Sequence, residues 1–152
     1  MNESDTMGPG AYSSSSLDSY LANFRADNSI AYRGNFGNFT VGALYSLGRD
    51  VANTNSPGGT NCPGEVANDS RACRVYSGML KYDVPAWGAA IGSDRIYGGS
   101  NAFGGLNRSS LSDTRVTSNG YVRLSNWKLT AGYLYRDNEG DPRKPRSDMW
   151  WV

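Results

Sequence analysis

The sequence contains no histidine among its 152 residues. Histidine is the commonest general base in enzymes and the commonest metal ligand in proteins. No nucleophilic side chain has a recognisable base partner, and no glycine-rich phosphate loop follows a strand and opens a helix. We therefore expect a protein that is not an enzyme and that needs no cofactor or metal ion.

Long apolar runs and single-sign charge clusters are also missing. No window reaches the roughly 18 apolar residues that a transmembrane helix needs. The opening MNESDTMGPG has neither the basic nor the apolar region of a secretory signal, which leaves export open because the chain can be a piece of a longer protein. The formal net charge is +1, and the sequence has no cluster of basic residues that could bind the phosphates of a nucleic acid. Nucleic acid is therefore not an expected partner.

Glycine and aromatic residues are abundant instead. The chain has 19 Gly, 10 Tyr and 4 Trp, but only 38% of its residues are hydrophobic, and its mean hydropathy is -0.56. Leu, Ile, Val and Phe are sparse, so the usual filling of a two-layer soluble fold is thin. The aromatic residues must therefore be accounted for in another way.

The segment WKLTAGYLYRD (127–137) shows how they are arranged. Apolar or aromatic residues occupy every second position, which is the pattern of a strand with two different faces. The same alternation recurs along most of the chain. The predicted strands cover residues 28–34, 39–48, 74–83, 87–97, 114–125 and 127–136, with MWWV at 149–152 beginning another.

Turns of two to four residues alternate with long polar loops at about 49–73, 98–113 and 137–147. Ten-residue two-faced strands, short turns at one end and long loops at the other are typical of a transmembrane β-barrel. The sequence therefore predicts an all-β fold, an antiparallel meander of long amphipathic strands over residues 28–152. The alternative is a soluble secreted all-β binding module, in which the aromatic strand faces form a core.

The first 27 residues differ from the rest. Leu17, Tyr20, Leu21 and Phe24 have helical spacing, and Ser16 is suited to cap the helix. One short helix is therefore predicted near residues 17–24, within an otherwise loop-like segment, 1–27.

Aromatic residues also gather beside the predicted turns. Phe39, Trp87 and Trp127 each follow a short turn, as expected for a girdle at a lipid–water interface. Ordinary cross-strand aromatic pairing is the alternative explanation. The predicted aromatic girdle consists of Phe39, Tyr45, Tyr82, Trp87, Trp127, Tyr133 and Tyr135.

Two cysteines, Cys62 and Cys73, lie in one loop, and their spacing does not fit a C-x-x-C redox or zinc motif. A disulfide between them would close a loop of about a dozen residues in an oxidising compartment. The alternative is two unrelated surface thiols.

Three segments carry a family resemblance: RADNSIAYRGNFGNFTVGALYSLG (25–48), YSGMLKYDVPAWGAAIG (76–92) and NGYVRLSNWKLTAGYLYRDNEGD (119–141). Together they resemble the general porins of Gram-negative bacteria, particularly the beta-proteobacterial ones. The resemblance implies an integral outer-membrane channel for passive diffusion of small hydrophilic solutes and ions. Family members form 16-stranded barrels, usually homotrimers, in contact with membrane lipid and lipopolysaccharide. The chain resembles a central part of such a protein, with about six middle strands.

In a pore of this kind, the face opposite the aromatic residues lines water, and wall charge filters the ions. The charged residues of that face are predicted to be Arg33, Lys81, Asp94, Arg123, Lys128 and Arg136. By its position, segment 1–27 resembles the pore-constricting third loop, whose candidate acids are Glu3, Asp5 and Asp18. Five basic residues against one acid on the wall predict a mild preference for anions, whereas the alternative is a set of ordinary solvated charges.

Overall fold

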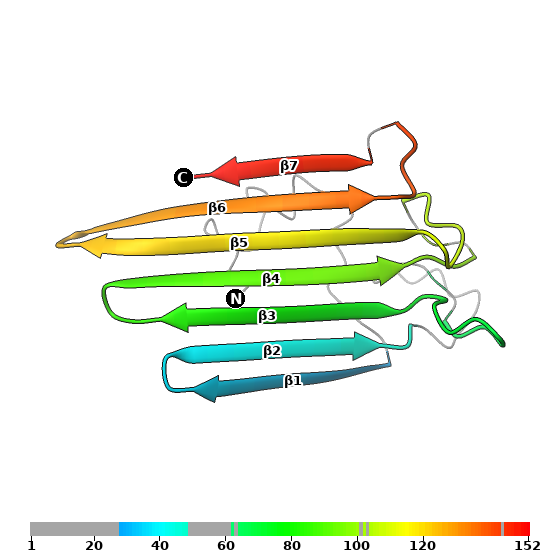
Figure 1. Ribbon diagram of the computed structural model, residues 1–152, viewed down its shortest axis with the longest axis horizontal. Coiled ribbons are helices and arrows are strands. Elements are labelled where there is room, and N and C mark those ends of the chain that lie inside the picture. Colours follow the sequence, from blue (N-terminus) through cyan, green and yellow to red (C-terminus); the bar gives the residue numbers. More distant parts are fainter. Residues whose placement is uncertain (1–27, 49–61, 63, 101, 103, 144) are drawn as a thin grey trace.

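A computed structural model describes residues 28–48, 62, 64–100, 102, 104–143 and 145–152 of the chain. These residues form seven β-strands in one sheet (Figure 1). The strands are β1 (Ser29–Phe36), β2 (Phe39–Ser46), β3 (Val75–Asp83), β4 (Trp87–Tyr97), β5 (Ser112–Leu124), β6 (Trp127–Asn138) and β7 (Arg146–Trp151).

The sheet is an antiparallel meander, in which each strand pairs with the next one in the chain. This confirms the predicted all-β meander. Within the described part of the chain the sheet is not closed, because β1 and β7 lie at its two edges. The predicted helix near residues 17–24 lies outside the described residues. Among those residues, no helix is long and apolar enough to cross a membrane.

The two ends of the sheet differ in their connections. The short turns at residues 37–38, 84–86 and 125–126 lie at one end, which we call the short-turn end. Gly37 and Ser125 each have positive φ, 60° and 54°, as two-residue hairpin turns require. The longer connections, residues 47–74, 98–111 and 139–145, lie at the opposite, long-loop end.

Strand β5 begins at Ser112, earlier than the alternation of residues indicates. Ser112 and Asp113 are polar and look like loop residues, yet they pair with Tyr97 and Ile96 of β4. The polar groups of Ser112 bind a residue of another connection: its amide and hydroxyl both donate to Glu139 Oε2, at 2.7 and 2.9 Å. Strand β5 is therefore longer than predicted because a side chain from another segment binds its first residue. The alternation of residues along the strand carries no information about such a contact.

The register gives every strand two distinct faces. We call the face that carries Arg33, Lys81, Asp94, Arg123 and Lys128 the polar face, and the opposite one the apolar face. The apolar face carries the exposed large hydrophobic side chains of the strands. They are Ile30, Tyr32, Phe36, Phe39, Tyr45, Tyr76, Leu80, Trp87, Ile91, Val122, Leu124, Trp127, Leu129, Tyr133 and Trp150.

Burial is reversed relative to a water-soluble sheet. Along β3, the apolar-face residues Tyr76 and Leu80 are exposed, whereas Ser77, Met79 and Lys81 of the polar face are half-buried. Exposure reaches 79% at Ile30 and 74% at Trp127. Within the described part of the chain, the aromatic strand faces are therefore exposed and do not form the core that a soluble binding module would need.

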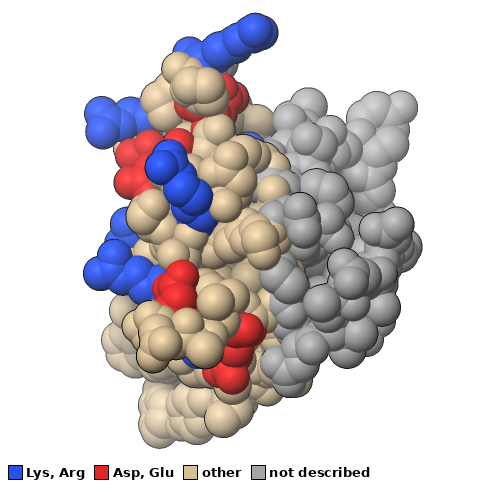
Figure 2. All heavy atoms as spheres, turned by 90° about the vertical axis from the view of Figure 1, so that its right-hand side faces the viewer, with Lys and Arg blue, Asp and Glu red and all other residues tan. Residues whose placement is uncertain are grey.

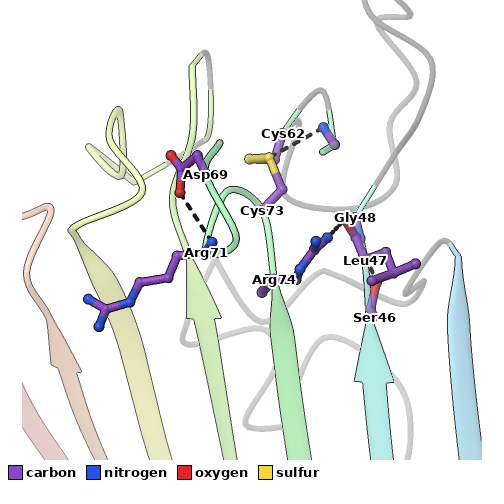
Figure 3. Close-up of a disulfide and its surroundings, with 9 residues drawn as sticks. Ser46, Leu47, Gly48, Cys62, Asp69, Arg71, Cys73 and Arg74 are labelled. Atoms are coloured by element: carbon purple, nitrogen blue, oxygen red, sulfur yellow. Dashed lines mark hydrogen bonds between the residues drawn. A yellow bond between two sulfur atoms is a disulfide. The ribbon is translucent and has the colours of Figure 1, made fainter. Parts of the chain in front are cut away.

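The small described core lies at the long-loop end instead. Ile96 and Leu106 are buried there, against Val75, Ala102 and Leu111. The structure joins Cys62 and Cys73 by a disulfide beside this core (Figure 3). Both sulfur atoms lie close to Gly99, where a Cβ atom would be 2.6 and 2.8 Å from them.

Arg74 fastens the same loop to the sheet. Its guanidinium donates to the carbonyl of Leu47 at 2.8 Å (Figure 3). It also donates to the carbonyl of Ser70 at 3.1 Å and forms an ion pair with Glu65 at 2.9 Å. Because these partners come from both ends of the connection between β2 and β3, Arg74 closes the connection at its base.

Candidate functional site

The register brings the predicted charged residues of the strands onto one face. Arg123 of β5 is directly opposite Lys128 of β6. Lys81 of β3 is opposite Thr40 and Ala90, and Arg33 of β1 is opposite Gly42. Asp94 and Arg136 both have Arg115 as a neighbour, on either side of β5.

Sequence reasoning missed three charged residues of this face: Asp83, Asp113 and Arg115. Asp83 ends both β3 and the predicted strand 74–83, so the period of two could have placed it, whereas Asp113 lies before the predicted strand 114–125 and resembles a loop residue. Arg115 lies eight residues before Arg123, so the period of two alone could have placed it. Among the described strand residues, the polar face thus carries six basic and three acidic residues, where the sequence alone predicts five against one. They are Arg33, Lys81, Arg115, Arg123, Lys128 and Arg136 against Asp83, Asp94 and Asp113.

Three of these charges form an arginine–aspartate cluster near the long-loop end: Asp113, Arg115 and Arg136. Asp113 is fully buried, and its carboxylate accepts hydrogen bonds from Arg115 Nη2 at 2.9 Å and from Arg136 Nε at 3.0 Å. Neighbouring strands bring the two arginines side by side, because they are Cα partners. One buried acid thus holds two guanidinium groups on the polar face.

A second group, which we call the Tyr121 cluster, lies at the short-turn end. It consists of Lys81, Asp83, Tyr121, Arg123 and Lys128. The Tyr121 hydroxyl donates to the Asp83 carboxylate, which also pairs with Lys81 Nζ at 3.4 Å. Lys128 Nζ lies 4.5 Å and Arg123 Cζ 5.6 Å from the centre of the Tyr121 ring. The electron-rich ring face attracts both cations.

Aromatic residues form two rows on the apolar face. At the short-turn end, Phe39, Tyr82 and Trp87 contact one another in sequence, with ring centroids 4.8 and 5.1 Å apart. These three belong to the predicted girdle, and Trp127 occupies the equivalent place beside the last turn. Their positions fit both a girdle and cross-strand pairing.

The second row lies toward the long-loop end. Tyr45 contacts Tyr76 at 5.2 Å, and Tyr76 contacts Tyr97 at 6.0 Å. Tyr76 and Tyr97 are not among the residues of the predicted girdle. Both follow the two-residue period of their strands from Tyr82 and Trp87, which is the signal that could have found them. Tyr133 and Tyr135 of the predicted girdle lie on the same face of β6.

Charges of both signs lie among uncharged residues at the long-loop end (Figure 2). Asp69, in the β2–β3 connection, is one of these charges and forms hydrogen bonds with its surroundings. A hydrogen bond with the Ser109 side chain lowers the pKa of Asp69 below its ordinary value, and the Arg71 amide donates to the same carboxylate at 3.1 Å (Figure 3). Asp69 therefore links two neighbouring loops.

Glu3, Asp5 and Asp18, the predicted constriction acids, lie outside the described residues.

The whole chain, residues 1–152, matches the family model described as Gram-negative porin. The chain belongs to the Gram-negative porin family. No curated protein and no solved structure matches it. Membership confirms the predicted porin, its outer-membrane location and its role as a channel protein. For this porin, the exposed apolar face and the polar, charged face are the two surfaces that a membrane-embedded oligomeric channel requires.

Proposed function

We propose that the polar face lines a water-filled channel through which small hydrophilic solutes and ions diffuse passively, with a mild preference for anions. The observation that supports this is the excess of basic over acidic residues on that face, six against three. Fixed positive charge on a pore wall raises the local concentration of anions and lowers that of cations. No catalytic step is involved.

The apolar face contacts membrane lipid in this proposal. Its hydrophobic side chains are exposed in each of the three described hairpins, as at Ile30, Leu80 and Leu129. The two aromatic rows mark the two interfaces, since tyrosine and tryptophan place an apolar ring and a polar group at the headgroup level. Between Trp87 and Tyr97 of β4, ten residues of strand span about 33 Å, which at a tilt of about 40° covers about 25 Å, the height of the apolar band of a barrel.

The proposed channel also has partners other than membrane lipid. We propose that it assembles as a homotrimer and that lipopolysaccharide contacts the long-loop end of its apolar face. Arg95 and Arg71 lie there at 5.2 and 6.0 Å from the centre of the Tyr97 ring. Guanidinium groups beside an aromatic ring suit the phosphates of a lipid headgroup, and both arginines are exposed although Tyr97 is half-buried.

The first prediction concerns ion selectivity. In planar bilayers with a KCl gradient, the protein is expected to show a reversal potential that favours chloride. Replacing one polar-face cation, Arg33→Gln, is expected to shift that potential toward cation preference by a few millivolts, because one positive charge leaves the wall.

The matched control is Arg143→Gln, which removes the same charge from an exposed position in the 139–145 loop and should leave the reversal potential unchanged. A cation preference of the unmodified protein would contradict the proposed selectivity. A shift of equal size in both variants would contradict the assignment of the polar face as the channel wall.

A further inference from the structure

We propose that the Tyr121 cluster is a discrete binding site for small oxyanions, such as phosphate or a carboxylate, at the short-turn mouth of the channel. The site rests on the proposed function, since it requires the polar face to meet solute-bearing water. Its ligand-binding groups are Arg123 and Lys128, and Tyr121, Asp83 and Gly88 position them.

The first argument is the placement of two like charges. Arg123 and Lys128 are Cα partners across the β5–β6 hairpin, on the same face, and both are exposed. Directly opposed side chains of an antiparallel pair lie about 5 Å apart at Cβ, and like charges there destabilise the sheet. An anion between the two cations removes this repulsion. The pair therefore forms an anion site that is stabilised when occupied.

The second argument is the preorganisation of the ring beneath the cations. The Tyr121 hydroxyl is anchored by the Asp83 carboxylate and lies 3.3 Å from the carbonyl of Val84. Gly88 leaves the space for this anchor: a Cβ atom there would lie 2.6 Å from both Asp83 Oδ1 and Tyr121 Cε1. The ring is thus fixed at both its polar tip and its edge before any ligand arrives.

The third argument concerns the acid nearby. Among the described residues at the short-turn ends of β3, β5 and β6, Asp83 is the acidic one, and it is engaged by Tyr121 and Lys81. The cluster holds three basic groups and one acid, so it remains cationic. This contrasts with the long-loop end, where both signs of charge are mixed (Figure 2).

The chemistry of the groups selects the class of ligand. A guanidinium offers parallel N–H donors that match two oxygens of a phosphate or carboxylate, and an ammonium adds a compact charge with three donors. A chloride ion uses the charge but not the paired donors. We therefore infer that oxyanions bind at this mouth in preference to halides.

The test is a titration of the detergent-solubilised protein with inorganic phosphate, followed by ³¹P NMR line broadening. The double variant Arg123→Gln/Lys128→Gln is expected to raise the phosphate Kd about tenfold, because two close Coulomb interactions are lost. Lys128→Gln alone is expected to raise it about threefold, and serves if the double variant does not assemble. The control Arg143→Gln/Arg146→Gln removes two positive charges at the long-loop end and should leave the Kd unchanged.

Positioning by Tyr121 has its own readout. Gly88→Ala keeps both cations but displaces the ring, and should weaken phosphate binding without changing the net charge. Unchanged phosphate affinity in the Arg123 and Lys128 variants would overturn the site, even where the bilayer reversal potential favours anions. A cation-preferring channel whose phosphate affinity still depends on Arg123 and Lys128 would instead overturn the proposed selectivity and leave the site standing.

Discussion

At the scale of single residues, Asp113 determines how the polar face is held together. The carboxylate is fully buried and lies between the guanidinium groups of Arg115 and Arg136. Removing the shared acid of a buried charge cluster takes a counter-ion from both arginines, and this costs more than the loss of a surface ion pair. Asp113 is therefore a structural residue that fixes the position of two cations on the polar face.

The second prediction follows from this arrangement. Asp113→Asn is expected to lower the free energy of unfolding by about 3–5 kcal/mol, because two guanidinium groups lose their shared counter-ion. Denaturant unfolding in lipid vesicles, monitored by tryptophan fluorescence, measures the change. Arg143→Gln, which removes a charge at an exposed position of the 139–145 loop, should stay within about 0.5 kcal/mol of the unmodified protein. Equal losses in the two variants would contradict the role given to Asp113.

At the scale of elements, the loops of the long-loop end are fastened to one another rather than to a large core. The disulfide between Cys62 and Cys73 lies against Gly99 of the next connection, and the Cys73 amide donates to the Gly98 carbonyl at 3.0 Å. Gly105 and Gly140 approach so closely that a Cβ atom on Gly105 would lie 2.0 Å from the Gly140 carbonyl oxygen. Three consecutive long connections therefore contact in series.

The third prediction tests the disulfide in this series. Cys62→Ser/Cys73→Ser is expected to destabilise the β2–β3 connection by about 3 kcal/mol, since the closed loop no longer restricts the unfolded chain. Limited proteolysis with mass spectrometry should show faster cleavage within residues 64–74. Cleavage within β3 and β4 should be unchanged, because their pairing does not involve the sulfur atoms. Faster cleavage throughout the sheet would contradict a purely local role.

At the scale of the whole molecule, the distribution of apolar and polar side chains is the reverse of that in a water-soluble sheet. Large hydrophobic residues are exposed on one face, and the polar face carries the more buried positions. A hydrocarbon environment reverses the usual cost of exposing Ile, Leu and Trp. The membrane therefore takes the place of the second layer that a soluble fold would supply.

The fourth prediction uses this contrast between the faces. Ile91→Arg places a charge in the middle of the apolar face, between Leu80 and Ser118, and is expected to cost about 2–4 kcal/mol at the bilayer midplane. Folding yield into vesicles, measured by heat-modifiable gel mobility, should fall. Asn119→Arg adds the same charge to the polar face of the adjacent strand and should fold at nearly the original yield. The opposite ranking would reverse our assignment of the two faces.

Several features of the sheet could be predicted because strand periodicity is local. Alternation placed Arg33, Lys81, Arg123, Lys128 and Arg136 on one face, as the register does. The same rule failed at the start of β5, where Asp113 looks like a loop residue and lies before the predicted strand 114–125. Its strand position depends on partners from other segments, which no local pattern contains.

The sequence by itself determined the meander, the two faces and the alternation of short turns with long loops. The physical reason is that side chains of a strand alternate with a period of two, so a residue's face follows from its parity. Only the tertiary structure decided which charges meet. It placed Asp113 between two arginines, and Arg123 and Lys128 around Tyr121. Such contacts depend on register between strands, because a shift of register by two residues keeps every face but changes every neighbour.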